Sequence, residues 1–173
     1  AEALFRSLND LDGASGAVTN QGNAFVEVGQ FEKALELYER GLVGHRQTGN
    51  RSFEAITLNG MGNVHLHLGK SVRAMELYRQ ALTIDQEMGK RHSEGVVLVN
   101  LANVYLQNGQ AQPALQLYRQ AEAIFRETKD AAARAGVLTN TGLVYTTMGR
   151  PREAQAYFRR ALPLYRATRD LSG

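Results

Sequence analysis

A glycine recurs every 40 residues along this chain of 173 residues. The four glycines are Gly29, Gly69, Gly109 and Gly149. Alanine, aromatic and asparagine residues recur at the same spacing. Their positions are Ala34, Ala74, Ala114 and Ala154, then Tyr38, Tyr78, Tyr118 and Phe158, and also Asn23, Asn63 and Asn103. A fixed period of this length predicts a stack of equivalent units, each packed on its neighbours, rather than a globule around one core.

Residues 91–130 show what one unit contains. Apolar residues at helical spacing run from Val97 to Tyr105, and Gly109 follows them. A second amphipathic stretch begins at Ala111. Because glycine adopts the left-handed conformation that ends helices, we predict two helices of about 18 residues each, joined by a turn at Gly109. The other three units have the same pattern.

The period also sets the predicted boundaries. The repeats are residues 11–50, 51–90, 91–130 and 131–170. Ala1, Leu4 and Leu8 align with Ala81, Ile84 and Met88. We therefore expect 1–10 to be the end of a preceding repeat's second helix, and 171–173 to be the start of a truncated next repeat. Uncapped ends of such an array expose apolar faces, so we also expect a longer array and end-to-end association between chains.

Within each repeat, a small residue is followed by an aromatic residue, an alanine, a second aromatic residue and another small residue. The matches are Gly22/Phe25/Ala34/Tyr38/Gly41, Gly62/His65/Ala74/Tyr78/Ala81, Ala102/Tyr105/Ala114/Tyr118/Ala121 and Gly142/Tyr145/Ala154/Phe158/Ala161. This pattern resembles the tetratricopeptide repeat (TPR). The resemblance implies an all-α fold, a right-handed α-solenoid of antiparallel helix pairs that forms a TPR superhelix. It also implies that the small residues let two helices approach closely.

The repeat length narrows the resemblance. The common TPR has about 34 residues, whereas this one has 40. The longer unit is similar to the repeats of Pins/LGN-type polarity adaptors, kinesin light chains and bacterial arrays that precede CHAT protease domains. Two departures stand out: His65 replaces the usual aromatic residue, and Pro163 should kink the last helix.

The first helices are nearly uncharged and rich in asparagine. The asparagines are Asn20, Asn23, Asn59, Asn63, Asn100, Asn103 and Asn140. A carboxamide both donates and accepts hydrogen bonds, which suits the backbone of an extended peptide. Asparagines in matching columns hold target peptides in Pins/LGN proteins and kinesin light chains, and the resemblance implies that role here. The alternative is that these side chains bridge neighbouring repeats, and the two roles can coexist.

A second row of residues should face the same concave groove as the asparagines and tune which side chains of a bound peptide are preferred. It contains Glu27, His67, Gln107 and Thr147. The column in which carboxylate-clamp TPRs need a cation contains Thr19, Asn59, Val99 and Thr139 instead. We therefore do not expect recognition of an acidic C-terminus.

Composition excludes several functions. The chain has no cysteine, so it has no thiolate metal site, and a reducing cytoplasm is the natural setting. No apolar run reaches the roughly 18 residues that span a membrane. His65 and His67 are two residues apart and point to different helix faces, so we expect no metal site. No carboxylate pair is suited to acid–base catalysis, so we expect no enzyme activity and no cofactor.

Three functions remain. The leading one is a protein-interaction module that binds an extended peptide or partner segment in the groove through the asparagines. The alternative is a regulatory or scaffold arm of a larger, bacterial effector protein, packed on its own effector domain. A nucleic-acid-binding role has only the pI near 9.3 in its favour. With a net charge of +3 and no basic cluster in the sequence, we do not expect nucleic acid as the partner.

Overall fold

The structure is a computed structural model that describes residues 2–170, with the side chains of residues 10–168. The described residues form eight helices and no strand. They divide into two compact units, Ala1–Gly89 (unit 1) and Lys90–Gly173 (unit 2). The predicted all-α fold of helix pairs is confirmed. None of the helices in residues 2–170 is both long and apolar enough to cross a membrane.

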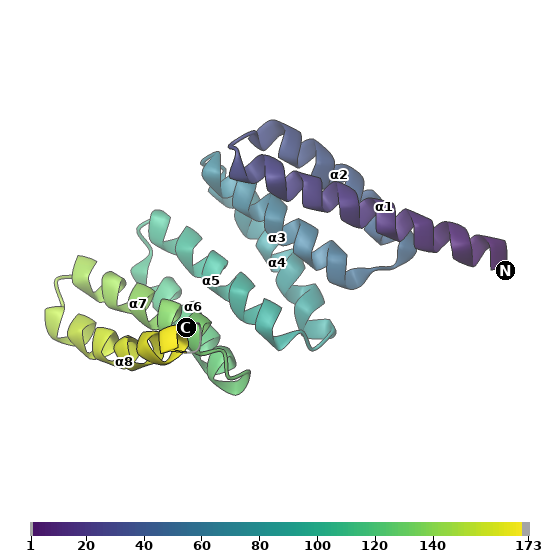
Figure 1. Ribbon diagram of the computed structural model, residues 1–173. Helices are drawn as coiled ribbons and strands as arrows, with labels where there is room; N and C mark the ends of the chain where they lie inside the picture. The colour runs from purple at the N-terminus through teal and green to yellow at the C-terminus, as the bar shows by residue number, and fades with distance from the viewer. Residues whose placement is uncertain (1, 171–173) are drawn as a thin grey trace. The chain divides into compact units, whose positions relative to one another are not determined.

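Unit 1 contains two helix pairs. Its helices are α1 (Glu2–Glu27), α2 (Phe31–Thr48), α3 (Arg51–His67) and α4 (Ser71–Glu87). Helix α1 packs on α2, α3 packs on α4, and α2 packs on α3 (Figure 1). Large apolar side chains fill the space between these helices. They include Tyr38, Leu58, Leu77 and Tyr78, each at most 2% exposed.

Unit 2 repeats this arrangement. Its helices are α5 (Arg91–Gln107), α6 (Ala111–Glu127), α7 (Ala131–Thr147) and α8 (Pro151–Asp170). Helix α5 packs on α6, α7 packs on α8, and α6 packs on α7. Tyr118, Phe125, Leu115 and Leu138 are among the large side chains buried in its core. Helices α3, α5 and α7 each begin at the first residue of a 40-residue period.

The periodic glycines end the first helix of each pair. Gly29, Gly69, Gly109 and Gly149 all have φ between 70° and 74°, the left-handed conformation that we predicted. At Gly69, for example, the amide donates to the Leu66 carbonyl at 3.0 Å, and the next amide donates to the His65 carbonyl at 2.8 Å. These bonds satisfy carbonyls that the helix end would leave without partners.

A second set of left-handed residues ends the second helices. Gly49 and Gly89 have φ of 70° and 64°, and Lys129 has φ of 58° at the equivalent position. Two of the residues that follow these positions cap the next helix. The side chains of Asn50 and Asp130 accept hydrogen bonds from the amides of Phe53 and Ala133.

The predicted packing role of the small residues is confirmed. A methyl group added at Gly22, Gly62 or Gly142 would lie 2.7, 2.6 or 2.5 Å from an aromatic ring of the second helix. The rings are Tyr38, Tyr78 and Phe158, in that order. In these three repeats the first helix therefore approaches its partner helix until the aromatic ring fills the place of a side chain.

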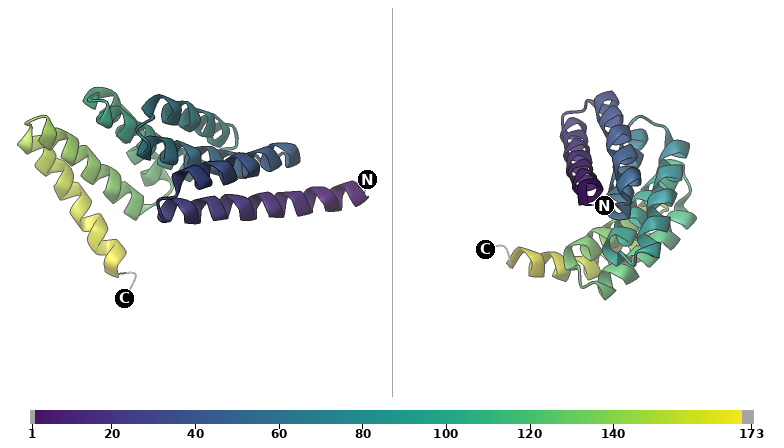
Figure 2. Two further views of the ribbon diagram at one scale, coloured as in Figure 1. Left: turned by 90° about the horizontal axis from the view of Figure 1, so that it is seen from above. Right: turned by 90° about the vertical axis from the view of Figure 1, so that its right-hand side faces the viewer.

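Helix α1 differs from our expectation. It runs from Glu2 to Glu27 without the break expected between residues 10 and 11, and its first turns extend past the end of α2 (Figure 2). Residue Asn9 occupies the column of Gly49 and Gly89 but is helical, and no described residue before Val28 has a positive φ. At this column Gly49 and Gly89 end their helices in the left-handed conformation, whereas Asn9 stays in α1. The side chains of Ala1, Leu4 and Leu8, and residues 171–173, lie outside the described part.

Helix α8 continues through Pro163 as far as Asp170. The kink expected at this proline stays a prediction.

Candidate functional site

Three of the predicted asparagines pair with a tyrosine of the second helix in the same repeat. The tyrosine hydroxyl donates to the asparagine Oδ1 in each case. The pairs are Tyr38–Asn23 at 2.6 Å, Tyr78–Asn63 at 2.7 Å and Tyr118–Asn103 at 2.5 Å. The tyrosine always follows its asparagine by 15 residues, because the turn at the periodic glycine folds the second helix back on the first.

The fourth repeat lacks this pair. Leu143 stands in the asparagine column and Phe158 in the tyrosine column, so both partners of the hydrogen bond are replaced together. Leu143 is 53% exposed and Phe158 36% exposed. The joint exchange indicates that asparagine and tyrosine work as a unit within a repeat. The bridging predicted from the sequence joins neighbouring repeats and does not include this pair.

Asn140 makes a contact between two repeats of unit 2. Burial raises the pKa of Tyr118 to about 12, while a hydrogen bond to Asn140 acts in the opposite direction. The phenol has one proton, which it donates to Asn103. Asn140 must therefore be the donor in its bond to Tyr118. The result is a relay from Asn140 through Tyr118 to Asn103 that connects α7, α6 and α5.

The relay fixes which way the two carboxamides point. Because Asn103 accepts through Oδ1, its Nδ2 remains available, and because Asn140 donates through Nδ2, its Oδ1 remains available. Neither remaining atom has a hydrogen-bond partner among residues 10–168. A tyrosine hydroxyl thus orients one free donor and one free acceptor on neighbouring helices.

A cavity of about 380 Å³ lies at these two asparagines. Its lining comes from α5, α6 and α7: Asn103, Leu106, Tyr118, Asn140, Leu143, Val144 and Thr147. No lining residue is charged. The lining combines two carboxamides and two hydroxyls with three aliphatic side chains, those of Leu106, Leu143 and Val144. This arrangement can hold a neutral polar group beside an apolar one.

The other predicted residues lie elsewhere. In unit 1, Asn20 and Asn23 are exposed on α1, and Asn59 is half-buried on α3. In unit 2, Asn100 is half-buried on α5. Asn59 and Asn100 both have polar partners. Their roles, like those of Asn63, Asn103 and Asn140, stay predictions.

The second predicted row is divided as well. The His67 ring stacks on Phe31, with centroids 5.3 Å apart and planes at 9°. Glu27 and Gln107 are exposed near helix ends, and Gln107 is outside the cavity lining. Only Thr147 of this row lines the cavity. Sequence reasoning missed Leu106, Leu143, Val144 and the hydroxyl of Tyr118. The paired exchange in the fourth repeat is a signal by which Tyr118 could have been found.

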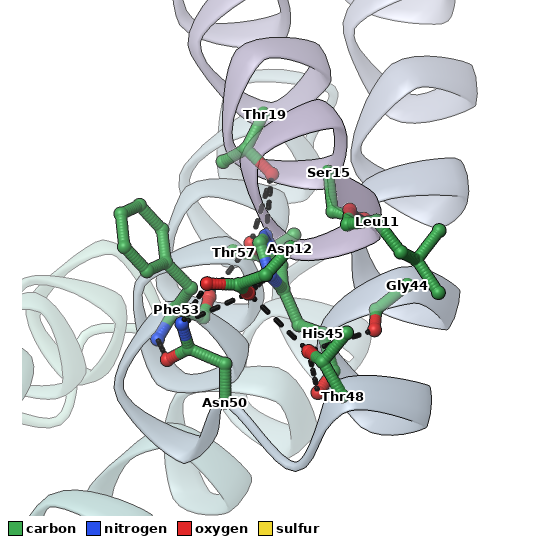
Figure 3. A network of polar contacts seen from close by, with 10 residues as sticks. All are labelled: Leu11, Asp12, Ser15, Thr19, Gly44, His45, Thr48, Asn50, Phe53 and Thr57. Carbon is green, nitrogen blue, oxygen red and sulfur yellow. Dashed lines mark hydrogen bonds and ion pairs between the residues drawn. The ribbon is translucent and has the colours of Figure 1, made fainter. Parts of the chain in front are cut away.

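Unit 1 contains a different polar cluster, centred on His45 (Figure 3). His45 is fully buried, with Nε2 3.1 Å from Thr19 Oγ1 and Nδ1 3.5 Å from Asp12 Oδ1. Its ring stacks on Phe53, with centroids 5.1 Å apart. Asp12 also accepts from Asn50 Nδ2 at 2.9 Å. The cluster connects α1, α2 and α3 and was not identified from the sequence.

Unit 2 holds 12 of the 20 basic residues, but several of them make contacts within the fold. Arg150 lies over the ring of Tyr145 at 5.0 Å, and Arg160 over that of Tyr157 at 5.1 Å. Arg160 also forms an ion pair with Glu122. These contacts favour a packing role over a phosphate-binding surface. Among the described residues, no group of three or more His, Asp or Glu side chains could hold a metal ion.

A family model for the tetratricopeptide repeat matches residues 14–87 and 91–167. BtubC (BKLC) from P. vanneervenii is similar in structure, with a TM-score of 0.82 and 25% identity over 98% of this chain and 73% of that one. No curated protein sequence matches the chain.

Two further solved structures share the fold at lower identity. A putative kinesin light chain of Podosopora anserina, with nearly identical TPR-like repeats, has a TM-score of 0.72 and 22% identity over 90% of this chain and 76% of that one. Aspartyl phosphate phosphatase F of Bacillus subtilis has a TM-score of 0.79 and 17% identity, over 90% of this chain and 41% of that one. At these identities the likeness concerns the fold alone.

Proposed function

The chain belongs to the tetratricopeptide repeat family, and from that premise we propose that unit 2 binds an extended peptide segment at the cavity between α5, α6 and α7. Repeats of this family in general mediate protein–protein interactions and are not enzymes. The proposal adds a place and a mode of binding to that general role.

The relay through Tyr118 carries the proposal. A peptide group presents one N–H donor and one C=O acceptor. The free Nδ2 of Asn103 suits the carbonyl, and the free Oδ1 of Asn140 suits the amide. Because Tyr118 already holds both side chains, binding would cost little side-chain entropy. Neutral amides also recognise the backbone without requiring a charged ligand.

Substitution of the two asparagines tests the proposal. The probe is a degenerate, end-blocked peptide library, followed by calorimetric titration of the peptides that the wild type selects. We expect Asn103→Ala and Asn140→Ala each to weaken binding about tenfold, because each loses one hydrogen bond of roughly 1–1.5 kcal/mol. Tyr118→Phe keeps both carboxamides but releases their orientation, and it should weaken binding less.

Gln112→Ala is the matched control, because this carboxamide is exposed on α6 and lies outside the cavity. It should leave affinity unchanged. Thermal unfolding of each variant separates a binding loss from a folding loss. If both asparagine variants remain folded and bind the selected peptides as well as the wild type does, the proposal is wrong.

The alternative from the sequence, a regulatory or scaffold arm, would use the same cavity with an occupant from its own polypeptide. In that case the full-length protein should bind the selected peptides only after its effector domain is removed. Binding by the intact protein would favour a separate partner. The cytoplasmic setting and the lack of catalysis stay predictions.

A further inference from the structure

The cavity differs from a ladder of amides alone because three of its seven lining residues are aliphatic. Leu143 occupies the column in which the other three repeats have asparagine, and it is 53% exposed. Val144 is buried beside it, and Leu106 of α5 is half-buried on the same cavity. A ligand that covers an exposed leucine at a polar site binds more favourably, because apolar surface is removed from water.

A charged group would be costly at this place. The seven lining residues include no Asp, Glu, Lys or Arg, so a buried ligand charge would have no partner of opposite sign. A small side chain such as alanine would leave the aliphatic lining residues in contact with water. A branched aliphatic side chain satisfies both conditions, because it is neutral and covers Leu106 and Leu143.

We propose that the cavity selects an uncharged, extended peptide segment with a branched aliphatic residue, and that Leu143 determines this preference. This inference rests on the proposed function. The peptide group held between Asn103 and Asn140 brings the adjoining side chain close to Leu143, since both asparagines and Leu143 line one cavity. The amides hold the backbone of the ligand, and Leu143 with Leu106 and Val144 contacts its side chain.

The test uses an end-blocked peptide library with one central position fixed in turn as Leu, Ile, Val, Ala, Asn, Asp or Lys. For the wild type we expect about tenfold enrichment of Leu, Ile and Val over Asn, Asp and Lys, the size of effect that one buried aliphatic side chain supplies. Leu143→Asn restores the residue of the other repeats. It should retain peptide binding and reduce the enrichment to about twofold or less.

Two further variants control the experiment. Leu143→Ala removes the aliphatic contact without adding a polar group, and it should also reduce the enrichment. Leu162→Asn changes a leucine of similar exposure, 50%, on α8 outside this cavity, and it should keep the wild-type preference.

The outcomes separate the two proposals. If the wild type binds no peptide in the library, the proposed function is wrong, and this inference is wrong with it. If peptides bind through Asn103 and Asn140 but show no aliphatic preference, only the inference is overturned. The same conclusion follows if the preference survives in both Leu143 variants.

Discussion

The hydroxyl of Tyr78 donates to Asn63 at 2.7 Å, and the same tyrosine ring lies where a side chain at Gly62 would have to go. Burial raises the pKa of Tyr78 well above its usual value, so the phenol remains a donor across the physiological pH range. One aromatic residue therefore provides both the close packing of the helix pair and the polar partner of its asparagine.

Tyr78→Phe should lower the free energy of unfolding by about 1 kcal/mol, because Asn63 loses its donor while the ring packing is kept. Adding Asn63→Leu should recover part of this loss, since the double variant reproduces the Leu143/Phe158 combination. Urea unfolding of the single and double variants measures the coupling. Additive losses would mean that the two side chains do not act as a pair.

His45→Ala should be strongly destabilising, by about 2–4 kcal/mol, because it opens a cavity against Phe53 and leaves Thr19 without its ring partner. The control is His92→Ala. His92 also lies near an aspartate, Asp130, at 3.6 Å, but its side chain is 55% exposed, so the loss should stay within about 0.5 kcal/mol. Similar losses in the two variants, measured by urea unfolding, would contradict a stabilising role for the buried cluster.

His65 should make stability depend on pH. Burial, with the charges of Lys70 and Arg73, lowers the pKa of His65 below its usual value of 6.5. The unfolded chain therefore takes up the proton first, and stability is lost as the pH falls from about 6.5 through the lower folded-state pKa. Above about pH 6.5 the group has no effect on stability.

His65→Phe, which introduces the residue type of Phe25, should remove this acid loss. Urea unfolding at about pH 7.5 and about pH 5.5 gives the comparison. His67→Phe, on an exposed face of the same helix, should keep the wild-type dependence. If His65→Phe loses as much stability on acidification as the wild type, another group is responsible.

Self-association at the C-terminal helix pair is the last prediction. Phe158, Leu162 and Tyr165 on α8 are between 36% and 50% exposed. We expect the average mass of the 173-residue polypeptide in light scattering to rise with concentration, and Leu162→Glu to reduce the rise. Val72→Glu is the control, since Val72 is a 74% exposed residue of α4. A wild type that stays monomeric at high concentration would rule out this association.

Much of the fold was predictable because local chemistry determines it. The periodic glycines end helices by their own left-handed conformation, so the pair of helices follows from sequence spacing. The site was less predictable. The Asn103 and Tyr118 columns are both visible in the sequence, but they meet only after the turn at Gly109 folds one helix on the other. The cluster at His45 draws residues from three helices, and the equivalent residue in the third repeat is Phe125, so the period gives no indication of it.

The paired exchange of Asn and Tyr for Leu and Phe has a consequence for lengthening the array by duplication. An inserted copy of residues 91–130 would bring its own Asn103 and Tyr118 equivalents, so its internal polar bond would be complete in the new copy. An inserted copy of residues 131–170 would instead bring a second leucine at the exposed position of Leu143, and no asparagine–tyrosine bond. Duplication of the third repeat therefore adds a further asparagine–tyrosine pair, whereas duplication of the fourth adds a further exposed aliphatic side chain.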